Sequence, residues 1–457
     1  MATADRAPSP VRKKNIMKKI GFISLGCSKN LVDTEVMLRN LHEAGYEITP
    51  DETEADIVVV NTCGFIESAK QESIDSILDV AWLKENRSLR GIIATGCLVE
   101  RYREEVLEQL PEVDALVGVG SLSRIAEAAD AVLSGKRGFC AFDDKETAPL
   151  GGERILTTPP YTAYLKIAEG CDNRCTYCAI PLIRGKFRSR PIEDIVAEAK
   201  DLEALGVKEL NLIAQDTTRY GLDLYGEYRL ADLVRAICKE TEIPWLRLLY
   251  CYPDKITDDL IDELAHNPRL LKYMDIPIQH IADPILAAMN RHGDSALIRQ
   301  TVARLRKAVP DITLRTTAIV GFPGEREEDF EALCSFIKEA RFERFGAFPY
   351  SAEEGTPAAV LPDQVDEQTK QDRYDVLMAT QLPISEAHNQ SMVGKTVTVL
   401  AEGFDPVAEA FYGRSAADAP DIDGKVYFHA RTPVEEGRFV KVRITEALDY
   451  DLLGEVK

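Results

Sequence analysis

The chain has 457 residues, 45% of them hydrophobic, which is enough to bury several cores. Its formal net charge of −21 argues against binding nucleic acid through a broadly basic surface and permits a basic protein partner. Its ten cysteines are too sparse for a disulfide scaffold, but three fall within eight positions. Such clustering is typical of metal ligands in an intracellular chain.

The chain begins with a polar, basic segment. Residues 1–17 include Arg12, Lys13 and Lys14 but no apolar stretch of the kind that a signal peptide needs, so we expect a disordered tail. No later run approaches the ~20 apolar residues of a membrane span. We therefore expect a cytoplasmic protein without membrane contact.

Residues 18–140 alternate short apolar runs with amphipathic stretches. Asn30 and Asp33 lie three positions apart, as at a helix N-terminus, and Gly45 is suited to end that helix. The alternation of strands and helices predicts a parallel α/β sheet. The strand-like runs are Ile20–Leu25, Ile57–Val60 and Ile92–Ala94.

A polar, turn-rich stretch over residues 141–156 predicts a linker. Residues 157–387 then contain six strand-like runs, most of them separated by helical stretches. Because a βαβ unit needs ~30 residues, this length predicts a partial, six-stranded barrel rather than a full one. The runs are Tyr161–Ile167, Glu209–Ile213, Trp245–Tyr250, Tyr273–Ile276, Ile312–Ile319 and Phe342–Phe348.

Residues 388–457 change character, with Gly and Pro between short β-like runs. This pattern predicts a small all-β barrel or sandwich. The runs are Val397–Leu400, Lys425–His429, Phe439–Ile444 and a last one near Leu452.

Cys171, Cys175 and Cys178 follow the first barrel run with the spacing C-x₃-C-x₂-C. A structural zinc site is the simplest alternative, but such sites almost always close with four ligands, and no fourth ligand lies nearby in the sequence. An iron–sulfur cube held by three thiolates keeps one iron open to a substrate. The loop after a barrel strand is also where barrel chemistry lies. The spacing therefore favours iron–sulfur over zinc.

Cys27, Cys63 and Cys97 each end an apolar run. The carboxyl ends of parallel strands share one rim, where ligands bind, so three loops could bring these thiolates together. Gly26 and Gly96 would let the backbone turn closely there. The alternative is that all three are small buried hydrophobic residues, and these residues alone leave both interpretations open.

The C-x₃-C-x₂-C motif, with Tyr177 before its last cysteine, resembles the signature of radical S-adenosylmethionine (SAM) enzymes. The upstream cysteines and the terminal β module resemble the methylthiotransferase branch of that family, over residues 19–457. This resemblance implies an N-terminal auxiliary-cluster domain, a radical SAM barrel and a TRAM domain. It also implies two 4Fe-4S clusters, an auxiliary one on Cys27, Cys63 and Cys97 and a SAM-binding one on Cys171, Cys175 and Cys178.

The resemblance implies two uses of SAM. One molecule supplies a methyl group to sulfur at the auxiliary cluster, and another yields the radical that abstracts hydrogen from the substrate carbon. A low-potential electron donor would serve as partner. Because the cofactors carry this chemistry, the protein must orient them and exclude water, so we expect the N-terminal domain to cap the barrel mouth.

The resemblance also suggests residues near SAM besides the cysteines. Glu209 is similar to the family's acid at the SAM amino group, and Arg188 is suited to the SAM carboxylate. Gly321 opens the stretch that resembles the adenine-side loop, and Gln215 and Tyr177 are expected cofactor neighbours. The alternatives are ordinary strand-end turns and, for Arg188, a solvated charge.

Members of this branch modify either an adenosine in tRNA or an aspartate of ribosomal protein S-twelve. Residues 24–33, 213–218 and 413–424 resemble the protein-modifying group. In the last of these stretches, Asp418, Asp421 and Asp423 would put carboxylates on the recognition face, which suits a basic protein better than phosphates; a solvated turn is the alternative.

The resemblance therefore implies methylthiolation of the aspartate β-carbon, without direct nucleic-acid binding. A tRNA methylthiotransferase is the alternative within the family. A non-catalytic, zinc-stabilised interaction module is the alternative from another class.

Overall fold

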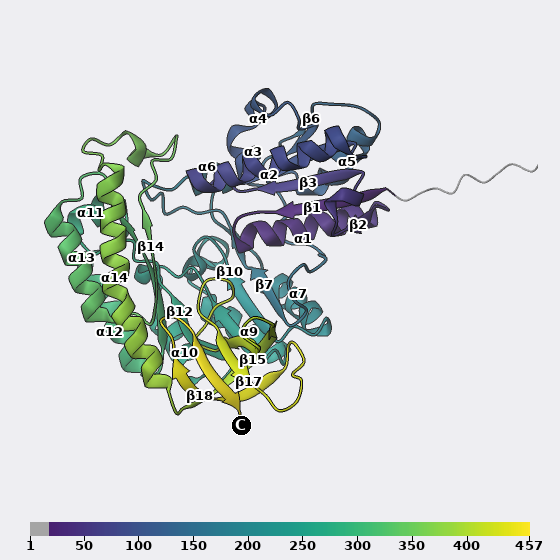
Figure 1. The fold of residues 1–457 in the computed structure, drawn as a ribbon. Coiled ribbons are helices and arrows are strands. Elements are labelled where there is room, and N and C mark those ends of the chain that lie inside the picture. The colour runs from purple at the N-terminus through teal and green to yellow at the C-terminus, as the bar shows by residue number, and fades with distance from the viewer. Residues whose placement is uncertain (1–17) are drawn as a thin grey trace, which may run out of the picture.

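A computed structural model describes residues 18–457; the tail expected over residues 1–17 lies outside the described residues. An α/β domain, an open six-stranded barrel and a small closed β-barrel follow one another along the chain (Figure 1). The predicted fold class is thereby confirmed. Over residues 18–457, no helix is both long and apolar enough to cross a membrane.

The N-terminal domain is a parallel sheet in the order β2-β1-β3-β4-β5-β6, with apolar clusters on both faces. The predicted strands form its centre, because β3 and β4 are buried along their whole length. The three flanking strands have three residues each and are too short to stand out in the sequence. The strands are β1 Lys19–Ser24, β2 Glu47–Thr49, β3 Ile57–Thr62, β4 Gly91–Gly96, β5 Ala115–Val117 and β6 Phe139–Ala141. The helices are α1 Ser28–Glu43, α2 Glu67–Asn86, α3 Cys97–Tyr102, α4 Glu105–Gln109 and α5 Ile125–Leu133.

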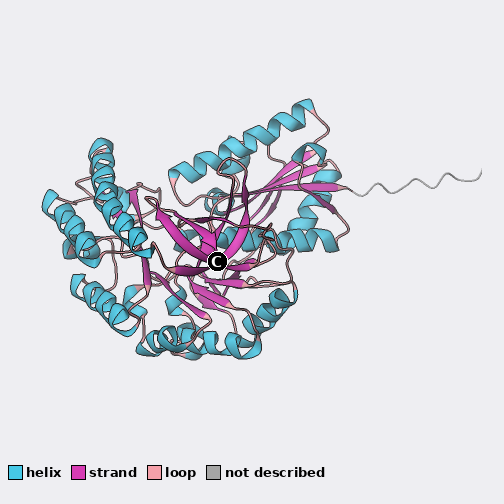
Figure 2. Ribbon diagram, turned by 60° about the horizontal axis from the view of Figure 1, so that its bottom comes forward, coloured by secondary structure: helices cyan, strands magenta, loops and turns pink. Residues whose placement is uncertain are grey.

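The second domain is the partial barrel, whose parallel strands lie in the order β14-β13-β12-β11-β10-β7. The predicted count of six strands is confirmed. Figure 2 shows these strands inside an arc of helices. The strands are β7 Thr162–Lys166, β10 Glu209–Ile213, β11 Trp245–Leu248, β12 Leu270–Asp275, β13 Thr313–Val320 and β14 Arg344–Pro349, and a separate pair is β8 Ala168–Glu169 with β9 Arg188–Ser189. The helices are α6 Ile180–Arg184, α7 Ile192–Ala204, α8 Leu222–Tyr225, α9 Leu230–Glu240, α10 Asp258–His266, α11 Asp283–Ala288, α12 Ser295–Ala308, α13 Glu327–Ala340 and α14 Glu367–Met392.

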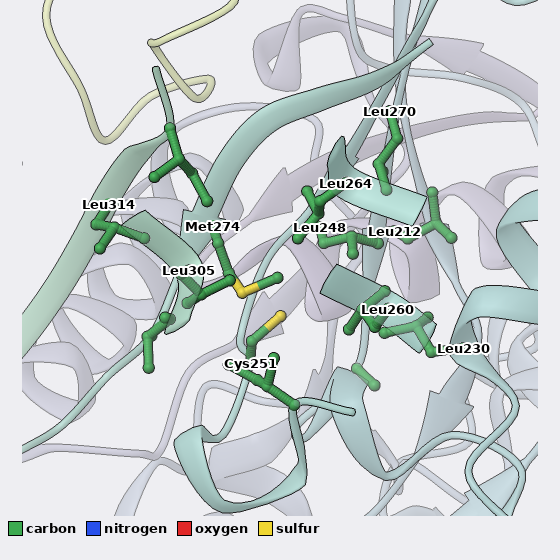
Figure 3. Packing of buried hydrophobic residues seen from close by; sticks show 14 of the residues in the cluster. Leu212, Leu230, Leu248, Cys251, Leu260, Leu264, Leu270, Met274, Leu305 and Leu314 are labelled. Atoms are coloured by element: carbon green, nitrogen blue, oxygen red, sulfur yellow. The ribbon is translucent and has the colours of Figure 1, made fainter. Parts of the chain in front are cut away.

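The main core fills the space between these strands and their helices (Figure 3). Leu212, Leu248 and Leu314 point outward from the strands and pack against helix residues such as Leu260 and Leu305. Because successive residues of a strand face opposite sides, the alternate positions face the barrel interior. Polar and aromatic residues occupy several of those interior positions, including Arg247, Tyr273 and Arg315.

The last domain is a closed barrel in the order β15-β16-β17-β19-β18. Helix α14 leads into it and continues past the expected boundary at residue 387. One strand was not expected from the sequence, because Ala410–Ser415 overlaps the acidic stretch interpreted as an exposed recognition face. The strands are β15 Thr396–Asp405, β16 Ala410–Ser415, β17 Val426–His429, β18 Phe439–Ala447 and β19 Leu452–Val456.

The N-terminal and C-terminal domains contact opposite ends of the partial barrel. The N-terminal domain reaches the carboxyl ends of the strands, where Lys166 of β7 binds Asp33 of α1. The small barrel reaches the amino ends, where Glu209 of β10 binds Arg414 of β16. The N-terminal domain thus covers the carboxyl ends of the barrel strands, as expected.

Candidate functional site

Cys171, Cys175 and Cys178 lie in the loop that follows β7 and β8. Cys171 and Cys175 are buried and Cys178 is half-buried. Gly170 starts the loop at φ +78°, and a Cβ there would lie 2.0 Å from the Lys186 carbonyl oxygen. Only glycine fits this close approach. Burial raises the pKa of the Cys171 thiol to about 11, so thiolate there needs a metal or another positive charge.

Two further strand-end loops approach the same cysteines. The Tyr252 hydroxyl lies 3.7 Å from the Cys175 sulfur, and Arg291 Nη1 lies 3.9 Å from it. The Arg291 guanidinium also stacks 4.1 Å above the Tyr252 ring. Sequence reasoning missed both residues. Tyr252 follows β11, and Arg291 lies after α11 in the connection that follows β12. These positions were the available signal, since connections that follow barrel strands gather at one rim.

Cys27, Cys63 and Cys97 follow the neighbouring strands β1, β3 and β4. Their loops are in close contact: a Cβ on Gly26 would lie 3.1 Å from the Cys63 sulfur, and one on Gly64 would lie 2.7 Å from Leu98 Cα. The structure thus brings the three cysteine loops to one rim of the N-terminal sheet. Burial raises the pKa of Cys97 to about 11.

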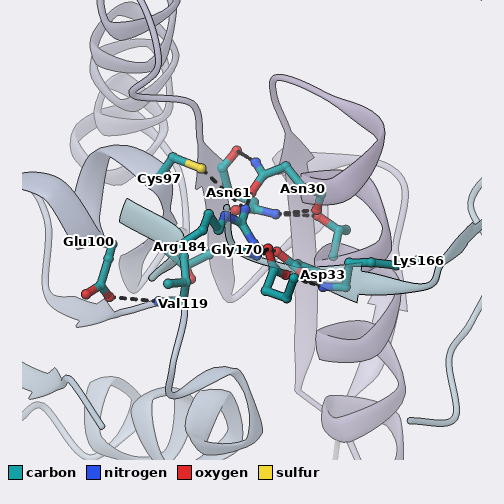
Figure 4. Close-up of polar contacts among 12 residues, drawn as sticks. Asn30, Asp33, Asn61, Cys97, Glu100, Val119, Lys166, Gly170 and Arg184 are labelled. Carbon is teal, nitrogen blue, oxygen red and sulfur yellow. Dashed lines mark hydrogen bonds and ion pairs between the residues drawn. The ribbon is translucent and has the colours of Figure 1, made fainter. Parts of the chain in front are cut away.

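The two cysteine sets meet through helix α6. Cys97 packs with Ala179, which directly follows Cys178, and with Ile183 of α6. Arg184, at the end of α6, is buried and donates from Nη2 to the Cys97 sulfur at 3.3 Å, as Figure 4 shows. One short helix therefore begins beside the barrel cysteines and ends on a cysteine of the N-terminal set.

A buried network of charges surrounds Arg184 (Figure 4). Asp33 accepts from both Arg184 and Lys166, the latter at 2.6 Å. Lys166 also donates to Glu169 at 2.8 Å. Burial by itself would raise the pKa of Glu169. The nearby Lys166 and Arg184 outweigh burial and lower this pKa to about 2. The carboxylates offset the cost of burying two cations at the junction of the domains.

Asn30 and Asp33 were expected to cap helix α1, and this expectation is wrong. The helix begins at Ser28, with Cys27 in the capping position. The Asn30 amide donates to the Leu25 carbonyl at 2.7 Å, and Asp33 binds the barrel. Both side chains are therefore used to hold the cysteine loop and the domain contact.

Of the other residues expected near SAM, Gln215 and Tyr177 lie beside the cysteine loop. Gln215 donates to Glu169 at 2.6 Å, two residues before Cys171, and Tyr177 lies between two of the cysteines in the chain. Gly321 follows β13 and has φ +70°. Its backbone amide donates a hydrogen bond to the Glu325 carboxylate at 3.0 Å. Arg188 donates to the backbone carbonyls of Lys145 and Ala148.

The structure places Glu209 at the wrong end of the barrel for a contact with SAM. It is the first residue of β10, whose other end lies near the cysteine loop, roughly 13 Å away at ~3.3 Å per residue. Its buried carboxylate accepts from Arg247 and Arg414 at 3.0 Å each. These arginines lower its pKa against the opposing effect of burial. Glu209 therefore joins the barrel to the C-terminal domain.

The recognition face expected from the acidic stretch is wrong for two of its three aspartates. Asp418 is buried and binds Arg344 at 2.6 Å. Asp423 accepts from the Tyr273 hydroxyl at 2.7 Å, and its side chain is 2% exposed. The stretch enters the amino end of the barrel, where these carboxylates neutralise interior arginines. Asp421 is exposed apart from a contact with the Tyr164 hydroxyl at 3.2 Å, so its recognition role stays a prediction.

Within residues 18–457, no group of three or more His, Cys, Asp or Glu side chains has the arrangement that holds a metal ion. The four cysteines outside the two sets pack in apolar cores, as expected. These are Cys140, Cys238, Cys251 and Cys334.

Three family profiles match the chain. The Uncharacterized protein family UPF0004 matches residues 19–118, the Radical SAM superfamily residues 165–337 and the TRAM domain residues 393–456. Together they correspond to the three bodies of the fold.

Close relatives span nearly the whole chain. A ribosomal protein uS12 methylthiotransferase RimO from Desulforamulus reducens is 51% identical over 446 residues, which is 96% of this chain and 100% of the relative. A protein of the same name from Geobacter sulfurreducens is 51% identical over 451 residues, or 97% of this chain and 99% of the relative. Among solved structures, the radical SAM methyltransferase TsrM from Kitasatospora setae has a TM-score of 0.56 at 14% identity, over 76% of this chain and 74% of that one. At this identity the likeness concerns the fold alone.

Proposed function

This chain belongs to the radical SAM methylthiotransferases named RimO, and on that premise we propose that it attaches a methylthio group to the β-carbon of an aspartate on ribosomal protein uS12, the S-twelve protein of the small subunit. The observation that carries the proposal is the contact between the two cysteine sets. Arg184 follows the barrel cysteines and touches the Cys97 sulfur at 3.3 Å. Cys97 is buried, Cys63 half-buried and Cys27 exposed. Two sulfur-bearing sites that meet at a buried arginine suit a reaction that needs both a radical and a sulfur transfer.

We assign two 4Fe-4S clusters to this junction, each held by three thiolates. The buried cations Arg184, Lys166 and Arg291 fit such a site, because thiolate-bound clusters carry negative charge that must be offset where water is excluded. When bound, the clusters and SAM supply the one-electron chemistry and the methyl group. The SAM-binding cluster is assigned to Cys171, Cys175 and Cys178, and the auxiliary cluster to Cys27, Cys63 and Cys97.

The chain's own residues would orient these groups and exclude water. Lys166 and Arg184 both bind Asp33 and thereby join the barrel rim to α1, so that the two cysteine loops keep one relative position. Tyr252 and Arg291 cover the Cys175 sulfur from the neighbouring strand-end loops. Tyr177, Gln215 and Gly321 stay candidate contacts to SAM.

The acidity of the chain supports a basic protein as substrate. Residues 388–457 contain eight Lys or Arg and twelve Asp or Glu, and acidic residues still predominate when the buried Asp418, Asp423 and Arg414 are left out. A module that binds RNA phosphates needs a net positive face. Direct binding of nucleic acid is therefore not expected. A low-potential electron donor is the other partner that the chemistry requires.

The substrate can be tested by comparing two products. The reconstituted enzyme is incubated with SAM, reductant, sulfide and either purified uS12 or tRNA. We expect a methylthio mass increment on one aspartate-containing peptide of uS12. Modified tRNA nucleosides beside an unchanged ribosomal protein would contradict the proposal. The reported relatives are named for the protein substrate, so the tRNA reaction is the less favoured.

The number of clusters can be tested by iron analysis after anaerobic reconstitution. We expect about eight irons per chain, and about four in Cys27→Ala and in Cys171→Ala, since each variant leaves one three-cysteine set intact. Bound zinc without iron would contradict both clusters. Cys238→Ala is the matched control, because Cys238 packs against the core and should keep all the iron.

A further inference from the structure

A cavity of about 370 Å³ lies at the junction of the N-terminal domain and the barrel. Helix α1, the loop over residues 145–154 and the β7–β9 region form its walls. At its outer rim lie exposed residues such as Glu43, Ser123 and Glu153. At its inner side lie Lys166 and Arg184, part of the charge network drawn in Figure 4. The cavity therefore connects the surface with the residues beside Cys97.

The walls of this cavity carry many charged side chains. Seven Lys or Arg side chains line it against five Asp or Glu. Most of these cations are paired: Arg190 binds Glu198 at 2.6 Å, and Arg154 binds Glu35 at 2.8 Å. Glu35 and Glu100, which pair with Arg154 and Lys145, lie just outside the lining, so the charges around the cavity balance. Among the described residues, Arg188 is the lining cation that has no ion pair.

Arg188 differs from the other cations of the cavity lining. Its two Nη nitrogens donate to the carbonyl oxygens of Ala148 and Lys145 at 2.8 and 2.6 Å. Its buried Nε has no hydrogen-bond partner, and no ion pair of Arg188 occurs within residues 18–457. A half-buried guanidinium that makes no direct ion pair and has a free donor is suited to bind an anion.

The reaction itself requires a sulfur atom from outside the chain. A methylthio group consists of a methyl group and a sulfur atom, and SAM supplies only the methyl. If the protein's cysteines stay cluster ligands, the sulfur comes from a cluster sulfide or from solution, and in either case repeated turnover requires a supply of sulfide-level sulfur. That species must be small and must reach Cys97 while the N-terminal domain covers the barrel mouth.

We propose that this cavity binds a small anionic sulfur species of the hydrosulfide class, held at Arg188 on its way to the auxiliary-cluster cysteines. The ligand assignment rests on the proposed function, whereas the anion site rests on the cavity alone. Arg184 lies at the inner side of the cavity and touches Cys97, so a bound anion would have a cationic path to that sulfur. Sequence reasoning had assigned Arg188 to the SAM carboxylate, and the test below separates the two ligands.

The first measurement is equilibrium binding of thiocyanate, a stable small sulfur anion, to the full reconstituted chain by calorimetry. We expect one site, weakened at least tenfold by Arg188→Gln, because a charge-assisted hydrogen bond is lost. Lys186→Gln is the matched control: Lys186 lies two residues away, its side chain is 70% exposed, and it is outside the cavity. Its affinity should stay within twofold of wild type. Unchanged thiocyanate binding in Arg188→Gln would overturn the proposal.

A second pair of variants tests the cavity while keeping all its buried charges, so that a folding defect does not explain the result. Ser123→Trp would narrow the exposed rim without touching a buried pair, and Ser134→Trp places the same residue on the surface away from the cavity. We expect Ser123→Trp to weaken thiocyanate binding and to raise the KM for sulfide at least tenfold with kcat unchanged, whereas Ser134→Trp does neither. Equal behaviour of the two serine variants would overturn the proposal.

The remaining outcomes separate this proposal from the proposed function. If Arg188→Gln weakens SAM binding and leaves thiocyanate binding intact, the cavity is a SAM subsite and the proposal is wrong. If thiocyanate binds through Arg188 but no uS12 is methylthiolated under any sulfide concentration, the anion site is supported and the proposed function is refuted.

Discussion

Arg184 shows how a single side chain can hold two sites together. Its guanidinium is 3% exposed and contacts Asp33, Glu169, Asn30 and Cys97. Removing such a buried cation would leave Lys166 alone to compensate two buried carboxylates, which costs more than the loss of a surface ion pair. The position of the N-terminal cysteines relative to the barrel thus depends on this residue.

Gly170 is the residue where a small change should have the most local effect. Because a Cβ at Gly170 would lie 2.0 Å from the Lys186 carbonyl, Gly170→Ala must displace the loop that carries Cys171. We expect loss of about half the iron, with the auxiliary cluster kept, as measured by iron content and by absorbance. Gly206→Ala is the control: Gly206 has φ +97° but no atom near its Cβ position. It should cost about 1 kcal/mol of stability and retain all the iron. Full iron in Gly170→Ala would contradict this interpretation.

Glu209 should give the protein an acid-sensitive contribution to stability. Arg414 and Arg247 hold its pKa below the ordinary value, despite burial. A carboxylate with a lowered folded pKa stabilises the fold fully above its unfolded pKa of ~4.3 and loses that effect as pH falls through the folded value. We expect Glu209→Gln to cost about 3 kcal/mol at pH 7 and progressively less below about pH 4, as measured by urea unfolding of the metal-free chain.

Glu402 provides the opposite control on the same arginine. Burial raises its pKa, so its ionised form is not favoured by folding. The stability difference between wild type and Glu402→Gln should therefore change with pH in the opposite direction. If the stability difference from wild type changed with pH in the same direction for both variants, the assigned pKa shifts of Glu209 and Glu402 would be contradicted.

At the scale of elements, the segment between β16 and β17 closes the amino end of the partial barrel. Six strands leave an interior lined by Arg247, Arg315 and Arg344, whose charges need partners when water is excluded. Asp418, Asp423 and the Ala416 carbonyl provide them. The acidic stretch is therefore a structural plug between two domains, and the charge there does not identify a substrate surface.

Two aspartates of this segment should differ sharply in their effect on stability. Asp418→Ala leaves the buried Arg344 unpaired, and we expect a loss of about 3–5 kcal/mol and faster proteolysis of the C-terminal domain. Asp421→Ala removes an exposed carboxylate at a residue with φ +65° and should cost about 1 kcal/mol, mainly from backbone strain. Urea unfolding and limited trypsin digestion measure both effects. Similar losses for the two variants would show that the segment is not a plug. A lower rate on uS12 in Asp421→Ala alone would support its predicted recognition role.

At the scale of the whole molecule, the carboxyl ends of the barrel are closed by the N-terminal domain from two sides. On one side α1 and α6 meet at Arg184. On the other, the buried Glu353, after β14, accepts from the Glu67 amide and from Arg101, both at 2.9 Å. Glu353 thereby attaches the start of α2, which follows Cys63, to the far edge of the barrel.

We expect Glu353→Gln to loosen this second attachment. The neutral side chain can replace only part of the hydrogen bonding to Arg101 and Lys70, so the amides at the start of α2 should exchange faster with deuterium while the barrel strands stay protected. SAM cleavage without methylthio transfer should rise, because the two cysteine sets would be held less firmly together. Glu354→Gln is the control, since that side chain is exposed and only its backbone carbonyl contacts Arg101. Unchanged exchange at α2 would contradict the role of Glu353.

Sequence patterns predicted what depends on local periodicity and spacing. The six barrel strands, the parallel N-terminal sheet and the terminal β module follow from alternating and buried runs, which a single strand or helix already displays. The three-residue strands β2, β5 and β6 have too little pattern to be found. Glu209 and the aspartates were misplaced because a charge in the sequence looks the same whether it faces a substrate or a buried arginine.

By itself, the sequence determined the three-domain order and the two sets of cysteines, because strand periodicity and motif spacing are local properties of the chain. The net charge of −21 likewise argued against a broadly basic surface, but it could not locate the recognition face. Tertiary structure alone decided that Arg184 joins the two sets, that Glu209 belongs to the opposite end, and that the acidic stretch plugs the barrel. The physical reason is that burial and pairing of charges depend on which distant residues meet, and that is decided only when the domains pack together.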